Sequence, residues 1–298
     1  MNTTTVTVVG LGAMGLPMAG HLAAEFTVRG VDISAERLAL GREAGIDVHT
    51  DVREASTGAD LVLLAVRNQA QLEDALFGER GIAEVMRPGS TVMVTSTVGI
   101  EAIASVLPLL RERSIHLVDA PVSGGPVRAG LGDLLVTVGA DDAAYQSALP
   151  VLEAMSSTLV RVGAEAGKGQ AMKTVNQLLC GIHIAAAGEA LALANRLGLD
   201  EKTALEALMG GAAASFMLGD RGERMLGAYG DEPVEVKSRL DIFVKDMGIV
   251  TDAARRAGIG VPLAAAAEQE YLAGLVRGMG AQDDSSIIRV IAPERLEG

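Results

Sequence analysis

The sequence feature that most constrains the fold is a complete G-x-G-x-x-G motif near the N-terminus. It comprises Gly10, Leu11, Gly12, Ala13, Met14 and Gly15. The β-type run TVTVV precedes it and the helical pattern LPMAGHLAA follows it. In such a unit the first glycine permits a tight turn, the second lets the backbone approach a pyrophosphate, and the third lets the helix pack closely on the strand. The motif therefore predicts a dinucleotide site, with a merely glycine-rich turn as the alternative.

The first half of the chain alternates short apolar or β-branched runs with helical patterns. Runs at residues 6–9, 28–31, 61–66, 91–95 and 116–119 are typical of parallel strands buried on both faces. Ser34 is expected to cap the helix that follows the second run, and Gly45 to end it. Runs at 134–138 and 158–162 flank a helical stretch at 141–155 and extend the sheet. The pattern predicts a doubly wound α/β sheet of the Rossmann type.

After Gly163 the strand pattern stops, and nearly everything to Pro293 is helical in pattern. We therefore expect two domains: an N-terminal domain over residues 1–165 and an all-α domain over 166–298, joined by a long interdomain helix. The tract 171–196 is apolar on most faces, so it has to be covered by its own domain or by a second subunit, and we expect both. This predicts a homodimer or a homotetramer. The most apolar part, residues 178–194, is shorter than the ~20 residues that span a bilayer.

Charge and composition exclude several classes of partner. The 298 residues carry 25 basic and 38 acidic side chains, a net charge of −13, and no basic run. Aromatic residues make up 2%. Nucleic acid and anionic membranes are therefore not expected as partners. A single cysteine, Cys180, excludes an intrachain disulfide, and no targeting pattern opens the sequence. We expect a cytoplasmic protein.

Asp32 ends the second predicted strand, 17 residues after Gly15. A carboxylate there would accept hydrogen bonds from the ribose hydroxyls of a dinucleotide and repel a 2′-phosphate, which favours NAD over NADP. The nearby Arg37 leaves NADP open. A role for Asp32 as a helix cap is the alternative, although Ser34 is better placed for it.

Two further segments carry polar groups in useful patterns. The loop DAPVSGGP follows a predicted strand, and Ser123 with the N–H groups of Gly124 and Gly125 could form an anion-binding nest or a structural turn. In GKGQAMKTVNQ, Lys173, Asn176 and Gln177 share one face of an apolar helix. A substrate with a hydroxyl and a carboxylate would satisfy all three, with Lys173 exchanging a proton at the reacting oxygen. A solvated stripe is the alternative.

Other candidate groups point to structure rather than chemistry. Cys180 and His183 lie among apolar residues and lack a third residue to orient a nucleophile, so structural packing is expected. No cluster of His, Cys and carboxylates has the spacing of a metal site. Lys245 and Asp246 form a charged pair beside an apolar helical run, which by periodicity alone is an ordinary surface pair.

Four motifs, in order and over essentially the whole chain, resemble those of the β-hydroxyacid dehydrogenase family, which includes 3-hydroxyisobutyrate dehydrogenase. They are GLGAMGLPMAGHL, DAPVSGGPVRA, GKGQAMKTVNQ and FVKDMG. The resemblance implies Lys173 as the catalytic lysine and NAD as the cofactor, bound by the glycine motif with Asp32, Val66, Thr97 and Lys245. It implies substrate binding by Ser123, Gly124, Gly125, Asn176, Gln177 and Asp246. Arg67 and Asn68 replace an apolar pair common in the family, and Gln177 replaces an asparagine.

The resemblance implies a small anionic hydroxy acid as substrate. The stretches VNQLLCGIHIAAAGEALALA and RLDIFVKDMGIV are most similar to family members that act on four-carbon sugar acids, so an acid such as L-threonate is expected. The alternatives are 3-hydroxyisobutyrate and reduction of tartronate, glyoxylate or succinic semialdehyde. An imine reductase is disfavoured because Lys173 is present, and 6-phosphogluconate dehydrogenase because its helical domain is longer. A catalytically silent dinucleotide-binding scaffold is the non-enzymatic alternative.

Overall fold

The structure is a computed structural model that describes residues 4–230 and 232–295. The chain divides into two units, Met1–Lys173 and Thr174–Gly298. The division falls inside the long helix α8 (Lys168–Arg196), whereas the sequence placed the domain boundary at residue 165, just before this helix.

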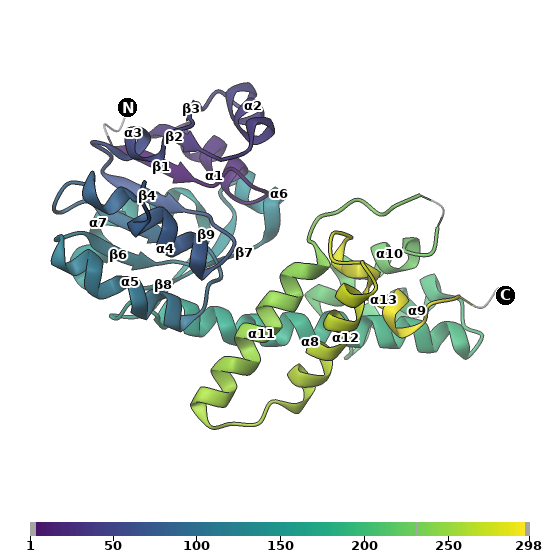
Figure 1. Cartoon of the computed structure of the whole chain (residues 1–298). Helices are drawn as coiled ribbons and strands as arrows, with labels where there is room; N and C mark the ends of the chain where they lie inside the picture. The colour runs from purple at the N-terminus through teal and green to yellow at the C-terminus, as the bar shows by residue number, and fades with distance from the viewer. Residues whose placement is uncertain (1–3, 231, 296–298) are drawn as a thin grey trace. The chain divides into compact units, whose positions relative to one another are not determined.

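Within the described residues, the N-terminal unit is built on a nine-stranded sheet (Figure 1). Its strands are β1 (Thr5–Val9), β2 (Thr27–Val31), β3 (Asp47–His49), β4 (Leu61–Leu64), β5 (Thr91–Val94), β6 (His116–Asp119), β7 (Val122–Ser123), β8 (Leu134–Gly139) and β9 (Ser156–Gly163). The order is β3-β2-β1-β4-β5-β6-β8-β7, with β9 paired to β8. The direction of winding reverses between β1 and β4. Ligands of doubly wound sheets bind at such a switch point, beyond the carboxyl ends of the strands.

The sheet is mixed rather than fully parallel. Strands β1 to β6 pair in parallel, but β8 runs antiparallel to β6 and β7, and β9 returns parallel to β8. The two predicted runs at 134–138 and 158–162 therefore do extend the sheet. Only the short helix α6 (Gly125–Gly130) separates β7 from β8. This connection is too short for the crossover that a parallel pair requires.

Helices cover both faces of this sheet. They are α1 (Gly15–Leu22), α2 (Ala35–Glu43), α3 (Val52–Ser56), α4 (Gln69–Phe77), α5 (Ile100–Glu112), α6, α7 (Asp142–Ala154) and the 3-10 turn η1 (Ile82–Glu84). Alternate strand residues face two separate cores, one with α1 and α7 and the other with α4 and α5. The central strands are thus buried on both faces, as their continuous apolar runs predicted.

The expected limits of α2 are confirmed. The Ser34 hydroxyl accepts a hydrogen bond from the Arg37 N–H, and Gly45 follows the helix with a φ of 76°. Two strands end earlier than predicted: β5 ends at Val94 rather than at Thr95, and β4 ends at Leu64 rather than at Val66. The reason is that Ala65 packs directly against Gly10, whose Cβ, if present, would lie 2.5 Å from the Ala65 carbonyl oxygen. The chain must turn away there to make room for the glycine loop.

The second unit is helical throughout its described regular structure, as predicted. It contains the rest of α8, α9 (Glu201–Met209), α10 (Phe216–Gly227), α11 (Leu240–Ala257), α12 (Pro262–Val276), η2 (Asp284–Ile287) and α13 (Ile288–Ile291). Its core includes a stacked pair, Phe243 and Tyr271, with ring centroids 5.4 Å apart. The buried Tyr271 hydroxyl donates to the carbonyl of Gly181 on α8. Helices α11 and α12 lie side by side (Figure 1).

Helix α8 differs from the others in length and in its surface. Its inner residues, such as Ile184 and Leu191, are fully buried, whereas Val175, Leu179 and Leu193 are more than half exposed. By length and composition alone α8 could cross a membrane, but half of its most apolar window is buried inside the protein. A core helix of a soluble protein has the same properties.

Candidate active site

The glycine motif forms the turn between β1 and α1, and each of its glycines has a distinct environment. Gly10 has a φ of 95°, and a Cβ on Gly15 would lie 1.8 Å from the carbonyl oxygen of Gly10. No atom lies within 4 Å of the Cβ position of Gly12. Gly10 and Gly15 are therefore required by the fold itself, while the surface above Gly12 is open to a ligand.

Asp32 lies beside this turn at the end of β2. One of its carboxylate oxygens accepts from the Leu11 N–H at 2.7 Å, and the other accepts from the Ser34 N–H at 2.8 Å. The side chain thus ties the glycine turn to the start of α2. Each oxygen keeps a second lone pair that could accept a ribose hydroxyl. The open surface at Gly12, the N-terminus of α1 and this carboxylate together fit a dinucleotide.

The loops after β4 and β5 hold the remaining predicted cofactor residues of this unit. Val66 is half-buried just past β4, and Thr97 is half-buried in the turn that leads to α5. One departure from the family pattern, Asn68, has a structural explanation, because its side chain caps α4 by accepting from the Gln71 N–H. The Gln71 side chain in turn accepts from the Arg67 N–H.

Lys173 and Ser123, predicted separately, are brought together by the fold. The Lys173 Nζ donates to the Ser123 Oγ at 2.8 Å, and Lys173 is only 8% exposed. Ser123 ends β7, and Gly124 and Gly125 follow it with φ values of 141° and 77°. These left-handed conformations turn the chain sharply after the serine, a geometry that explains the paired glycines.

The sequence analysis missed two buried residues beside Lys173, namely Gln170 and Asp119. The Gln170 side chain donates to Asp119 at 2.9 Å, and the same carboxylate accepts from the N–H groups of Gly167 and Gln170 at the start of α8. Burial raises the pKa of Asp119 to about 6, against the opposing effect of these hydrogen bonds. Asp119 lies in the motif DAPVSGGPVRA and Gln170 in the motif GKGQAMKTVNQ. The sequence therefore placed both residues near the site but did not predict that they bond to each other.

In the helical unit, α8 and α11 contribute a chain of four polar side chains. The Asn176 amide donates to the Gln177 Oε1 at 2.9 Å, and the Gln177 amide donates to Asp246 at 2.6 Å. Lys245 forms an ion pair with Asp246 at 3.0 Å. Asp246 is 2% exposed, so the interpretation of Lys245 and Asp246 as an ordinary surface pair is wrong for the aspartate. The reason is that Asp246 points to α8, where Gln177 provides a donor.

The predicted residues thus form two groups, one in each unit. The N-terminal group holds the glycine motif, Asp32, Val66, Thr97, the Ser123–Gly125 segment and Lys173, and the helical group holds Asn176, Gln177, Lys245 and Asp246. Cys180 is half-buried and accepts from the Asn176 amide. Among the described residues no group of three His, Cys or carboxylate side chains is placed to hold a metal ion.

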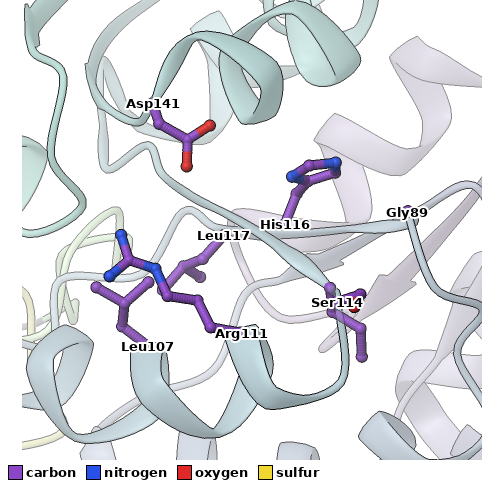
Figure 2. Close-up of a pocket in the computed structure, with 8 residues that line it drawn as sticks. Gly89, Leu107, Arg111, Ser114, His116, Leu117 and Asp141 are labelled. Atoms are coloured by element: carbon purple, nitrogen blue, oxygen red, sulfur yellow. The ribbon is translucent and has the colours of Figure 1, made fainter.

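A surface pocket of about 300 Å³ lies elsewhere in the N-terminal unit (Figure 2). Its lining includes Gly89, Arg111, His116 and Asp141. Gly89 precedes β5 and His116 begins β6, so the pocket is at the amino ends of the parallel strands. The glycine turn follows the carboxyl end of β1. The pocket is therefore at the opposite end of the sheet from the candidate site.

Comparisons with known proteins agree with this arrangement. Residues 5–163 match the family model for the NAD binding domain of 6-phosphogluconate dehydrogenase. Residues 167–291 match that described as NAD-binding of NADP-dependent 3-hydroxyisobutyrate dehydrogenase.

Relatives extend over nearly the full length. L-threonate dehydrogenase from Cupriavidus necator is 38% identical over 293 residues, covering 98% of this chain and 97% of the relative. The Escherichia coli K12 enzyme of the same name is 35% identical over 295 residues, covering 98% and 96%. The crystal structure of a Salmonella typhimurium 3-hydroxyisobutyrate dehydrogenase is 35% identical, covers 96% of this chain and 99% of that one, and has a TM-score of 0.89. The chain therefore belongs to the β-hydroxyacid dehydrogenase family of NAD(P)-dependent oxidoreductases.

Proposed function

We propose that the protein transfers a hydride between NAD and a four-carbon sugar acid such as L-threonate, with Lys173 as the general acid and base. The observation that carries this proposal is the hydrogen bond between the buried Lys173 and Ser123. It places the buried amine of the GKGQAMKTVNQ motif beside a hydroxyl on the proposed substrate loop. When bound, the nicotinamide supplies the hydride acceptor or donor.

The proton and the substrate carboxylate are handled by different groups. In the oxidation direction, Lys173 Nζ takes the proton from the reacting hydroxyl, and in reduction it returns the proton. Ser123 Oγ and the N–H groups of Gly124 and Gly125 bind the carboxylate, which fixes one end of the substrate. The short distance between Ser123 and Lys173 keeps the carboxylate and the reacting carbon close to each other.

Asn176 is proposed to bind a further hydroxyl of the substrate. Its amide nitrogen donates to Gln177 and Cys180, which directs its Oδ1 away from both. Within residues 4–230 and 232–295, no side chain donates a hydrogen bond to that oxygen. Gln177 and Asp246 were expected to contact substrate hydroxyls directly, but they are bonded to each other. We propose that their main role is to orient the side chain of Asn176.

The identity of the substrate is supported by two findings. The relatives named L-threonate dehydrogenase match over almost the whole chain. The half-buried Asn176 also carries an amide oxygen that a hydroxyl of a sugar acid could reach and a methyl group could not use. Leaving such an oxygen desolvated and unpaired costs about 1–3 kcal/mol, which amounts to roughly tenfold or more in specificity.

The substrate proposal is tested by measuring NADH formation with a panel of acids. We expect kcat/KM for L-threonate to exceed that for 3-hydroxyisobutyrate by about tenfold or more. The methyl ester of L-threonate should be a poor substrate, because it lacks the charge that the Ser123 loop binds. A better rate with 3-hydroxyisobutyrate, or an equal rate with the ester, would overturn this assignment.

We propose NAD rather than NADP as the preferred cofactor, supported by the carboxylate of Asp32 at the ribose end of the predicted site. The unmodified protein should show the higher kcat/KM with NAD. Asp32→Ala should reduce the difference in kcat/KM between NAD and NADP. It should also weaken NAD binding, because the Leu11 and Ser34 N–H groups lose their acceptor. Equal turnover with NADP in the unmodified protein would refute the preference.

We further propose that the chain forms a homodimer or homotetramer in the cytoplasm. The exposed apolar side chains of α8, Val175, Leu179 and Leu193, support the association, and the single cysteine supports the location. Light scattering after gel filtration should give a multiple of 30.6 kDa. Leu193→Glu should lower that mass, and a monomeric parent protein would contradict the proposal.

A further inference from the structure

Three segments of the N-terminal unit meet at the side chain of Gln170. The first is the turn at residues 96–99, here called the Thr97 turn, which joins β5 to α5. The second is the end of β6 at Asp119, and the third is the first turn of α8, which carries Gln170 itself. Gln170 is 1% exposed, so its amide has to find its partners within the protein.

The amide makes four hydrogen bonds to the first two segments. Its Oε1 accepts from the N–H groups of Val98 and Gly99, both at 3.0 Å. Its Nε2 donates to the Ser96 carbonyl at 3.0 Å and to the Asp119 carboxylate at 2.9 Å. The orientation of the amide is therefore defined, since reversing it would oppose donor to donor and acceptor to acceptor.

Asp119 completes the attachment of α8. Its second oxygen accepts from the N–H groups of Gly167 and Gln170, each at 2.9 Å, so a side chain of the sheet caps the long helix. The approach is close, because a Cβ on Gly169 would lie 2.5 Å from the Asp119 carbonyl oxygen. The first turn of α8 thus has little freedom to shift along β6.

Lys173 follows Gln170 by three residues, on the same side of α8. Its partner Ser123 follows Asp119 by four residues, so two side-chain contacts connect the 119–123 segment to consecutive turns of α8. The same amide of Gln170 holds the Thr97 turn. We propose that Gln170, with Asp119, is a positioning residue that sets the Lys173 amine relative to the Thr97 turn, and this proposal rests on the proposed role of Lys173.

The positioning role predicts a specific kinetic result for Gln170→Met, which keeps the length of the side chain and removes its hydrogen bonds. We expect kcat with L-threonate and NAD to fall by about tenfold or more, because misplacement by a fraction of an ångström slows the chemical step. L-threonate deuterated at its carbinol carbons should show a larger isotope effect on kcat than with the unmodified protein. NADH affinity, measured by fluorescence, should change by less than about twofold, because no contact of the glycine turn is altered.

A pair of variants separates positioning from a general loss of stability. Gln170→Glu places a carboxylate against Asp119 and the Ser96 carbonyl, and Asp119→Asn alone opposes an amide nitrogen to the Gln170 Nε2. When Asp119→Asn is combined with Gln170→Glu, the amide nitrogen at position 119 can donate to the carboxylate at position 170. The double variant also has the same number of carboxylates as the unmodified protein. We expect the double variant to recover at least about fivefold in kcat over the slower single variant.

The matched control is Thr91→Val, at the other end of β5. Thr91 is 1% exposed and bonds to Ser147 at 2.7 Å, so its loss lowers stability without touching the Thr97 turn. Its kcat and isotope effect should be unchanged. The positioning role is refuted if Gln170→Met shows a normal kcat and isotope effect, or if the double variant is no faster than the slower single one. An unmodified protein that gave no NADH with any hydroxy acid would instead refute the proposed function.

Discussion

The two groups of candidate site residues are held in place in different ways. In the N-terminal unit the main chain does most of the shaping, through glycines with positive φ and N–H groups that reach Asp32 and Asp119. In the helical unit, side chains hold side chains, from Asn176 through Gln177 to Asp246. An atom added at a glycine of the N-terminal turn should disrupt that turn, whereas in the helical unit the removal of one partner should disorient the others. Substitutions in the two units should therefore have different signatures.

The largest effect is expected at Lys173, the last residue of the N-terminal unit. Lys173→Ala should lower kcat by about a hundredfold or more and leave NAD binding nearly unchanged, because it removes proton transfer and no contact of the glycine turn. Lys173→Arg should recover little, since a guanidinium is not a base near neutral pH. Steady-state kinetics and NADH titration measure both quantities. Ordinary turnover by the alanine variant would place the acid and base elsewhere.

The glycine turn gives the next largest effects and separates binding from folding. Gly15→Ala forces a Cβ to within 1.8 Å of the Gly10 carbonyl oxygen, so the variant should lose about 2 kcal/mol of stability or more. Gly12→Ala meets no protein atom within 4 Å, so its melting temperature should be normal. Its affinity for NAD should nevertheless fall by about tenfold or more, because the methyl group occupies the path of the pyrophosphate.

Gly20→Ala is the control for this pair. Gly20 lies in the interior of α1, and no atom lies within 4 Å of its Cβ position. Alanine there should raise stability by up to about 1 kcal/mol without changing NAD affinity. Thermal denaturation and calorimetric titration of the three variants provide the comparison. If Gly12→Ala bound NAD normally, the dinucleotide would have to lie away from this turn.

In the helical unit the sharpest test is Asp246→Ala. It removes the acceptor of the Gln177 amide and the partner of Lys245, so Asn176 loses its fixed orientation. We expect kcat/KM for L-threonate to fall by about tenfold, with a much smaller fall for 3-hydroxyisobutyrate, which has fewer hydroxyls to bind. An equal fall in kcat/KM for the two acids would show that the polar side chains from Asn176 to Asp246 do not bind the substrate hydroxyls.

This difference between the units also explains what the sequence could predict. The turn at Gly10–Gly15 depends on residues adjacent in sequence, so a spacing of glycines between a strand and a helix was enough to place it. The same holds for the cap of α2 at Ser34 and for the helical character after Gly163. These features follow from local propensity and periodicity.

The pairings over long sequence separations were not predictable in this way. Asp119 and Gln170 are 51 residues apart, and Gln177 and Asp246 are 69 apart. Asp246 lies three residues after Phe243 and four before Val250, on the apolar face of α11, but periodicity does not indicate that Gln177 is its partner. The mixed direction of β8 was also missed, because a continuous apolar run has the same pattern in parallel and antiparallel strands.

The smallest effect is expected at Glu270, a half-buried carboxylate that lies near the like charge of Glu189. In the N-terminal unit, burial raises the pKa of Asp119, and hydrogen bonds from Gln170 and from the start of α8 oppose that rise. In the helical unit, burial and the nearby charge of Glu189 raise the pKa of Glu270 from 4.5 to about 7. The folded state therefore binds this proton more tightly than the unfolded state does, and stability falls as the pH rises from about 4.5 to about 7. Above about pH 7 Glu270 is charged in both states, and the loss of stability caused by its charge in the folded state is complete.

Glu270→Gln should remove this loss of stability, because glutamine carries no charge at any pH. Because Glu189 is exposed and solvent screens its charge, we expect the melting temperature at pH 8 to rise by only about 1–3 °C. At pH 4.5 the variant and the parent should melt at the same temperature, since the parent is then protonated at this site. Glu268→Gln, two residues earlier on α12, is the matched control for the removal of one carboxylate from this helix. A variant that was less stable than the parent at pH 8 would show that the Glu270 charge has a stabilising partner, as the Asp119 carboxylate has.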